Sequence, residues 1–308
     1  HKAIYFKLPI IEGKLKGKKF LVWKTTPWTI PANVALIINP EFEYGIYKKD
    51  NEELILLKSL AEKILDKDFI LAQSIKGKDL KGIKYEGPFD NLPRIKKIAS
   101  EKLKTFHTVV LDKDLVTEIE GTGIVHCAPG AGEEDFKIGQ REDLAVIDVI
   151  DEGAVYLDGM EEFSGKNAKQ NPEIIFDYLK TYKNGDFFFK TEDYTHRYPT
   201  CWRCKTELVW RVVDEWYISM DKIRKNLQKI TEKINWIPSF GKERELDWLK
   251  NMRDWLISKK RYWGLALPIF ECECGNFEVI GSKEELKKRA VEGWEKFEGN
   301  SPHKPWID

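Results

Sequence analysis

Short apolar runs separated by Pro, Gly and Asn dominate the first half of the chain. Runs of this length, bounded by turn-forming residues, are typical of buried strands. The predicted strands are 20–23, 34–38, 44–47, 54–57, 108–111 and 123–127. The polar stretch between the third and fourth runs predicts a hairpin. We therefore expect residues 1 to about 160 to form a β-rich domain.

Helical spacing of apolar residues becomes common further along the chain. Ser59 and Glu62 fit a capping box that would begin a helix near residue 59. Another helix is expected from Asn171, with Pro172 at its first helical position. After about residue 210, apolar residues recur at Ile223, Leu227, Ile230 and Ile234. A second helix over 242–258 and a third, capped by Ser282 and Glu285, complete a helical continuation.

Composition describes an ordinary soluble protein and limits its partners. Lys plus Arg and Asp plus Glu total 51 each among 308 residues, so the chain lacks the basic excess of a dedicated nucleic-acid binder. Nowhere do 18 apolar residues run together, so no membrane span is expected. The chain begins at His1 without a Met and stops at Asp308, and we expect both ends to be cuts inside a longer protein.

The cysteines indicate metal rather than disulfides. Five Cys, two close pairs and no secretory signal favour reduced thiols in the cytoplasm. Cys201 and Cys204 have the spacing of a metal knuckle, which predicts half of a Cys₄ zinc site. Cys272 and Cys274 resemble the first half of a second knuckle, although the usual spacing is one residue longer. The alternative joins both pairs into one Cys₄ site.

Residues 23–33 carry three Thr hydroxyls and one Asn amide, interrupted by two prolines. The prolines prevent a regular helix or central strand. Such a loop can present neutral donors and acceptors to a small polar ligand or to a water. Considered alone, these residues favour the simpler interpretation, a Thr-rich turn between two strands.

Residues 121–135 form an apolar strand that ends near His126 and enters a Gly-rich, acidic loop. His126 and Asp135 could converge on one pocket at the strand end. The alternative is a histidine at the end of a strand followed by a solvated loop. Cys127 points to the face opposite His126, so we expect it in the core and not in a Cys–His nucleophilic pair.

Together these two loops resemble the signature segments of the isoleucyl-tRNA synthetase editing domain. Thr-Thr-Pro-Trp-Thr-x-Pro-Ala-Asn begins at Thr25, and Gly-Thr-Gly-Ile-Val-His-x-Ala-Pro-Gly begins at Gly121, about a hundred residues later. Further segments of the family follow in order at 198–204, 216–220, 253–264 and 303–308.

The resemblance implies an α+β fold in three parts. Residues 1–195 would form a β-barrel-like class Ia synthetase editing domain, and 196–210 a Cys-x-x-Cys knuckle with a return strand. Residues 211–308 would be part of an α/β Rossmann-type catalytic domain with zinc-knuckle insertions, the second of them near 270–280. The zinc would be structural, and each Cys pair here would find its partner pair outside this chain.

The resemblance also implies site residues. Thr25 and Thr26 would hold the misacylated 3′ end and an attacking water, and Asp135 would pair with the substrate α-ammonium. Asn33 and His126 would belong to the substrate pocket, with His126 restricting the amino acid. The chain departs from the family pattern at Lys24, where a third threonine is common, and at Ala131, where a histidine is common.

The implied function is hydrolysis of the aminoacyl ester of valyl-tRNA(Ile) after transfer, within an isoleucine-tRNA ligase. One methylene discriminates by only about 1–3 kcal/mol, and isoleucine against valine is the standard case of this limit. The expected partners are the tRNA(Ile) acceptor end and its valine ester, and the protein is expected to be monomeric. ATP and Mg would be used only by a longer protein, because neither His-x-Gly-His nor Lys-Met-Ser-Lys-Ser is present. The alternative is a catalytically silent tRNA-binding or zinc-stabilised insertion, which Lys24 leaves open.

Overall fold

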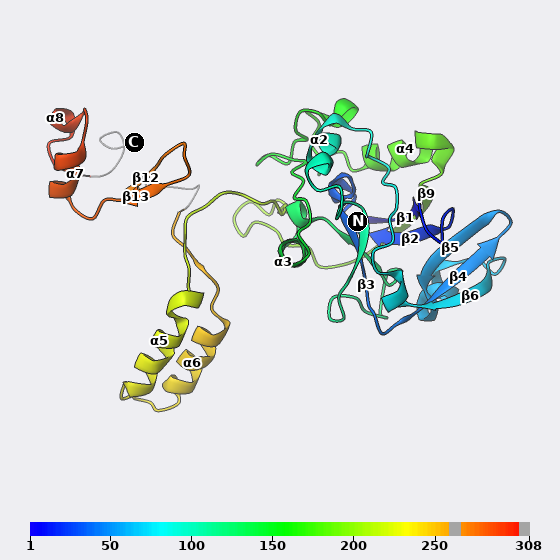
Figure 1. Cartoon of the computed structure of the whole chain (residues 1–308), viewed down its shortest axis with the longest axis horizontal. Helices are drawn as coiled ribbons and strands as arrows, with labels where there is room; N and C mark the ends of the chain where they lie inside the picture. The colour runs from blue at the N-terminus through cyan, green and yellow to red at the C-terminus, as the bar shows by residue number, and fades with distance from the viewer. Residues whose placement is uncertain (259–265, 302–308) are drawn as a thin grey trace. The chain divides into compact units, whose positions relative to one another are not determined.

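The structure, a computed structural model, describes residues 1–258 and 266–301 (Figure 1). Its backbone contacts divide the chain into unit 1, His1–Val212, and unit 2, Val213–Asp308. Each unit is described by itself. Two of the predicted segments, 259–264 of the fifth motif and 303–308, lie outside the described residues. No described helix has the length and apolar character that crossing a bilayer requires.

Unit 1 is built on two open sheets. The larger has six strands in the order β6-β4-β5-β2-β1-β9, and the smaller has three in the order β7-β3-β8. The strands are β1 (Lys2–Pro9), β2 (Lys19–Lys24), β3 (Ala35–Ile38), β4 (Glu43–Lys49), β5 (Glu52–Leu57), β6 (Ile70–Lys76), β7 (Thr108–Leu111), β8 (Ile124–Cys127) and β9 (Phe188–Asp193). The β-barrel-like arrangement that we expected is not closed: the strands form two separate sheets, and β6 and β9 are the edge strands of the larger one.

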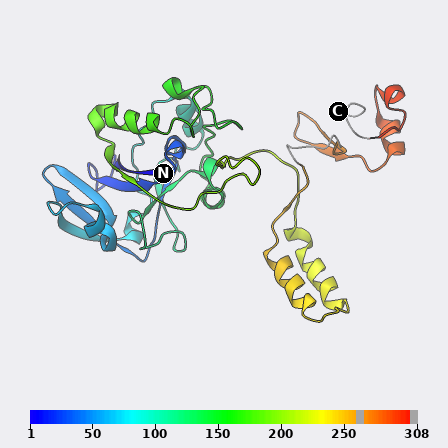
Figure 2. The same cartoon turned by 180° about the vertical axis from the view of Figure 1, so that it is seen from behind.

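The apolar runs became strands because they supply the core. Phe20, Leu21 and Val22 of β2 and all four residues of β3 are fully buried. The polar stretch 48–53 turns β4 back onto β5 as an antiparallel hairpin, as predicted. Viewed from behind, β4, β5 and β6 form the outer part of the larger sheet (Figure 2).

The smaller sheet brings the two predicted loops together. β3, which follows the first loop, pairs antiparallel with β8, which leads into the second, with Ala35 opposite Cys127. The amide of Val34 donates to the carbonyl of Cys127 at 3.0 Å. The end of one loop and the start of the other are therefore neighbours, although about ninety residues separate them in sequence.

Short helices connect and cover these sheets. In unit 1 they are η1 (Pro27–Ala32), η2 (Lys58–Leu60), α1 (Ala61–Ile64), η3 (Gly77–Leu80), α2 (Pro93–Glu101), η4 (Pro129–Ala131), α3 (Glu133–Arg141), η5 (Glu161–Phe163), α4 (Glu173–Thr181) and η6 (Tyr182–Gly185). α4 begins directly after Pro172, close to the predicted start, and buries Ile175, Phe176 and Leu179.

The capping box predicted at Ser59 is wrong. The hydroxyl of Ser59 donates to Glu118 at 3.0 Å instead of capping a helix, and only the single turn of α1 follows. A contact between residues 59 positions apart thus overrides the local signal.

Unit 2 contains a helical hairpin, short strands and two smaller helices. α5 (Asp221–Lys233) and α6 (Gly241–Asn251) lie side by side in both views (Figures 1 and 2). The remaining described elements are β10 (Tyr217–Ile218), β11 (Trp255–Leu256), β12 (Ile269–Glu271), β13 (Phe277–Val279), α7 (Lys283–Arg289) and α8 (Trp294–Phe297). α6 ends seven residues before the predicted 258.

The second predicted capping box, at α7, is confirmed. Ser282 Oγ accepts from the backbone N–H of Glu285 at 3.1 Å, and the Glu285 carboxylate accepts from the N–H of Gly281 at 2.9 Å. The two bonds satisfy donors that a helix start leaves unpaired.

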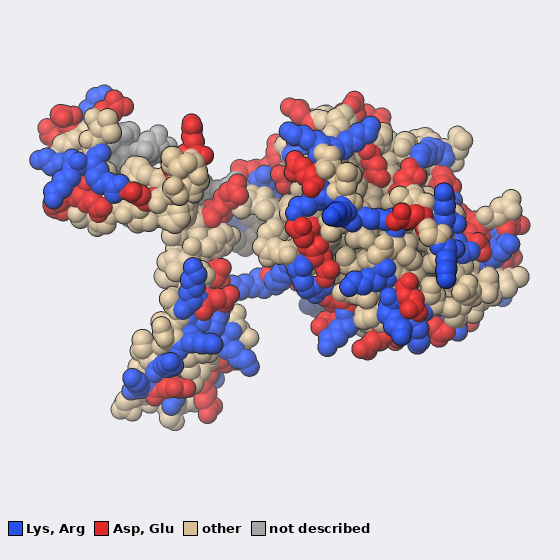
Figure 3. Space-filling model, in the orientation of Figure 1, with Lys and Arg blue, Asp and Glu red and all other residues tan. Residues whose placement is uncertain are grey.

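Charges of both signs are interspersed over the face of unit 1 in Figure 3. This agrees with the zero formal net charge of the chain. Recognition of an anionic partner therefore depends on particular side chains and not on the overall field.

Candidate active site

The first predicted loop leaves β2 and turns at once into a 3₁₀ helix. Thr26 is the residue before η1, and its carbonyl accepts from the backbone N–H of Thr29 at 3.1 Å and from the Thr29 hydroxyl at 2.8 Å. Pro27 and Pro31 fix backbone φ values compatible with this tight turn. Thr29 is thereby used for the fold, whereas the side chains of Thr25 and Thr26 face a cavity.

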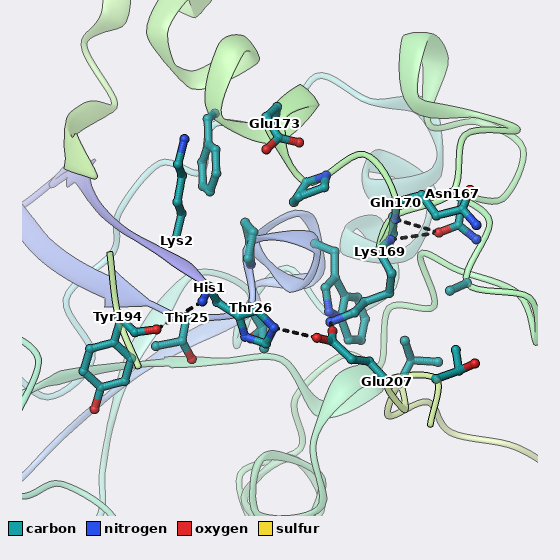
Figure 4. Close-up of a pocket in the computed structure, with 18 of the residues that line it drawn as sticks. His1, Lys2, Thr25, Thr26, Asn167, Lys169, Gln170, Glu173, Tyr194 and Glu207 are labelled. Carbon is teal, nitrogen blue, oxygen red and sulfur yellow. Dashed lines mark hydrogen bonds and ion pairs between the residues drawn. The ribbon is translucent and has the colours of Figure 1, made fainter. Parts of the chain in front are cut away.

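That cavity has a volume of about 890 Å³ and lies entirely within unit 1 (Figure 4). Thr25, Thr26 and the buried Trp28 line one side of it. Lys169 and Glu207 line another and form an ion pair at 2.5 Å. A volume in this range is typical of small-molecule pockets.

A second, smaller cavity of about 220 Å³ lies beside the first loop. Lys24, Thr25 and His126 are among its lining residues. Thr25 therefore borders both cavities, and the two predicted loops share the smaller one.

His126 is the most unusual side chain of this smaller cavity. It is 1% exposed, and neither ring nitrogen has a hydrogen-bond partner within the part of the chain that the structure describes. Burial, and then the positive charge of Lys24, lower its pKa well below the usual 6.5. The Ile30 backbone lies close enough to the ring to oppose this shift, although it does not reach the geometry of a hydrogen bond. The imidazole is therefore neutral at pH 7, with one donor and one acceptor unused.

This depressed pKa predicts a pH-dependent stability. Below about pH 6.5 the unfolded chain binds a proton at His126 that the folded chain does not. The free energy of unfolding should therefore decrease as the pH is lowered below about 6.5. One proton gives at most about 1.4 kcal/mol per pH unit. Urea unfolding at several pH values between about 5 and 8 checks this.

The matched control is His126→Gln, which keeps a polar side chain but cannot titrate. Its free energy of unfolding should depend less steeply on pH between about 5 and 6.5 than that of the parent chain. Identical slopes in the two proteins would show that His126 does not have a depressed pKa.

Asn33 is placed in the core and lines neither cavity. It is 4% exposed, and its amide nitrogen donates to the carbonyls of Ala35 at 3.0 Å and Cys127 at 3.4 Å. Its oxygen accepts from the buried Tyr85 hydroxyl at 2.6 Å. The amide thus ties the first loop to β8, and its predicted contact with the substrate stays a prediction.

Asp135 lies in the first turn of α3 and likewise lines neither cavity. Its Oδ2 accepts from the N–H of Ala128 at 2.9 Å, which holds the second loop against the start of α3. Within the described residues its Oδ1 has no hydrogen bond or ion pair. His126 lines the smaller cavity and Asp135 lines neither, so the two side chains do not converge on a single cavity. The segment between them, η4, contacts η1 of the first loop.

The two cysteine pairs lie in different units. Cys204 is exposed, and hydrogen bonds from Thr206, with a further one from Cys201, lower its pKa to about 7. Cys272 and Cys274 are exposed at the β12–β13 hairpin, and Cys272 lowers the pKa of Cys274. In the described ranges no group of three or more His, Cys, Asp or Glu is arranged to hold a metal. Each pair offers two thiolates, which is half of a tetrahedral site.

The wall of the larger cavity opposite Thr25 and Thr26 was not predicted from the sequence. Asn167, Lys169 and Glu207 belong to loops with no recognisable pattern, and they reach the cavity only through the fold. Lys169 also lies over the Tyr198 ring at 4.2 Å. Trp28, on the side of Thr25 and Thr26, is an aromatic residue inside the Thr-rich segment and was the signal that the sequence offered for this cavity. Its buried Nε1 has no hydrogen-bond partner among the described residues.

Comparison with known proteins identifies the family. The model of tRNA synthetases class I (I, L, M and V) matches residues 11–303. The chain belongs to this class I tRNA synthetase family. The resemblance drawn from the two loops is thereby confirmed, and the loops that the β3–β8 pairing brings together are those of a synthetase.

Curated relatives of this synthetase chain are isoleucine–tRNA ligases. That of Saccharolobus solfataricus is 39% identical over 306 residues, which cover 97% of this chain and 30% of the relative. That of Clostridium novyi is 40% identical over 307 residues, which cover 97% and 28%. The chain therefore spans about three tenths of the length of the curated relatives that it matches.

Among solved structures, the editing domain of the P. knowlesi cytosolic leucyl-tRNA synthetase overlaps with 61% of this synthetase chain and 95% of its own. The TM-score is 0.44 and the sequence identity 11%. A score at this level supports no structural argument, so the family assignment depends on the sequence matches.

Proposed function

We propose that this chain hydrolyses the aminoacyl ester of misacylated valyl-tRNA(Ile), the post-transfer editing reaction of an isoleucine–tRNA ligase. The observation that carries the proposal is the pairing of β3 with β8, which joins the Thr-rich loop to the His126 loop around two adjoining cavities. These are the two segments in which the chain resembles the editing domain.

The chemistry requires little from the protein. An aminoacyl ester is already activated, so a water held in line with its carbonyl carbon suffices. The hydroxyls of Thr25 and Thr26 face the larger cavity and can hold that water and the terminal ribose. The neutral His126 at the wall of the smaller cavity limits the size of the amino acid.

Asp135 supplies the charge that recognises the amino acid. Its Oδ1 is available for a charge-assisted hydrogen bond with the α-ammonium, while its Oδ2 remains bound to the Ala128 N–H. Because Asp135 lines neither cavity, we propose that the second loop moves toward the substrate when the ester binds. Asn33 acts as a positioning residue that holds the first loop in register with β8.

The tRNA(Ile) acceptor end is the proposed partner. The larger cavity is wide enough for a terminal nucleotide. Lys169 and Lys2 on its walls could contact the backbone phosphates. The chain would carry out this reaction as a monomer in the cytoplasm.

The proposed roles of unit 2 and of the cysteine pairs depend on parts of a longer protein. We propose that 211–308 is part of the Rossmann-type catalytic domain, and that each Cys pair supplies half of a structural zinc site. The lowered pKa of Cys204 and Cys274 suits thiolate ligands. Isoleucine activation with ATP and Mg would belong to the longer protein.

A catalytically silent tRNA-binding or zinc-stabilised insertion is the second candidate. The observation that favours it is Lys24, a cation beside the Thr-rich loop where a third threonine is common. Deacylation of valyl- and isoleucyl-tRNA(Ile) separates the two functions. Editing predicts faster loss of valine, and a silent module predicts no acceleration of either.

A further inference from the structure

Lys24 is the last residue of β2, is half-buried, and lines the smaller cavity. Among the described residues its ammonium makes no ion pair or hydrogen bond. Glu120, an acid of the same cavity wall, accepts a hydrogen bond from the Tyr194 hydroxyl. An ammonium without a direct partner in a partly closed cavity can form a charge-assisted hydrogen bond with a ligand. This arrangement suggests that a negatively charged ligand atom completes the site.

His126 is the second, independent observation. It lines the same cavity and is only 1% exposed, and over residues 1–258 and 266–301 both of its ring nitrogens are without hydrogen-bond partners. Buried polar groups are almost always hydrogen-bonded, so an unpartnered donor and acceptor point to a bound water or ligand. Thr25 adds a hydroxyl to this wall.

Lys24 and His126 together fit one part of an aminoacyl ester, its carbonyl oxygen. A cation repels the α-ammonium, so that group cannot lie toward Lys24. The carbonyl oxygen is an acceptor and becomes negatively charged when water attacks the ester, so a nearby ammonium stabilises it most in the transition state. The ammonium then lies on the other side of the carbonyl, where Asp135 is proposed to bind it.

We propose that Lys24 is a catalytic residue that binds the ester carbonyl oxygen and stabilises the oxyanion formed during hydrolysis. This inference depends on the proposed editing function. Water forms the new bond to the carbonyl carbon, and the carbonyl electron pair moves to the oxygen facing Lys24. The intermediate then expels the ribose oxygen, which takes the proton lost by water, and free valine and tRNA result.

The test uses Lys24→Met, which keeps the length of the side chain and removes its charge, with Lys24→Arg as the conservative control. We expect Lys24→Met to lower kcat for valyl-tRNA(Ile) about 100-fold with little change in KM. Lys24→Arg should recover most of the rate. Equal thermal midpoints for the three proteins show that folding is intact. If Lys24→Met is unstable, Lys24→Gln replaces it.

A second substrate separates the carbonyl from the phosphate as the group that Lys24 binds. The valine ester of adenosine contains the same carbonyl but no phosphate, so Lys24→Met should lower its hydrolysis by the same factor. A loss confined to valyl-tRNA(Ile) and expressed in KM would overturn the proposal and indicate that Lys24 binds phosphate. An unchanged kcat for both substrates would also overturn it. If the parent chain hydrolyses neither substrate, the editing function itself fails, which is a distinct result.

Discussion

Replacing Asp135 by Ala is expected to lower hydrolysis of valyl-tRNA(Ile) about 100-fold. The variant loses the only carboxylate that we propose to meet the α-ammonium, and a hydrogen bond to a charged group contributes up to about 3 kcal/mol, or two factors of ten. It also releases the Ala128 N–H, which Asp135 Oδ2 holds at 2.9 Å. Single-turnover deacylation measures the change.

Asp135→Asn separates these two effects. The Asn oxygen can still accept from Ala128, but the side chain has no charge for the ammonium. We expect near-parental stability and a loss of activity close to that of Asp135→Ala. Glu134→Ala, an exposed carboxylate one residue earlier in the same helix turn, is the matched control and should leave the rate unchanged. A fully active Asp135→Asn would show that the carboxylate charge has no part in editing.

Replacing Asn33 by Ala is expected to cost about 2–4 kcal/mol of the free energy of unfolding. The change leaves the buried Tyr85 hydroxyl without its 2.6 Å acceptor and the carbonyl of Ala35 without its 3.0 Å donor. Each buried group left unpaired costs about 1–3 kcal/mol. Urea unfolding, with the exposed Asn51→Ala as control, measures the difference.

Tyr85→Phe completes a double-mutant cycle for this contact. Removing both partners should cost less than the sum of the two single changes, because neither group is then left alone. Strict additivity, or a loss below about 1 kcal/mol in Asn33→Ala, would show that the amide does not hold the loop to β8.

The strands could be predicted because burial leaves a local mark. β2, β3, β5 and β8 each contain a short apolar run bounded by turn-forming residues, whereas β1, β6 and β9 were not predicted. The hairpin of β4 and β5 was equally readable from the polar residues between them. The capping box at Ser282 could be predicted because its partners lie three residues apart.

The site could be predicted only in part, because its geometry depends on contacts between distant segments. The two loops were identified from their residues, but the pairing of Ala35 with Cys127 that joins them is a property of the fold. The sequence of the first loop does not show that a tyrosine 52 positions later will bind the Asn33 amide. Ser59 failed for the same reason, since Glu118 competes for its hydroxyl.

The central claim is tested most directly by single-turnover deacylation of valyl-tRNA(Ile) and isoleucyl-tRNA(Ile) by this chain, measured in parallel with the spontaneous loss of each ester. We expect the chain to accelerate loss of valine and to leave the isoleucine ester close to its spontaneous rate, because the cavity wall formed by His126 excludes the larger side chain. Equal acceleration of both esters would contradict the proposed selectivity, and acceleration of neither would contradict editing by this chain.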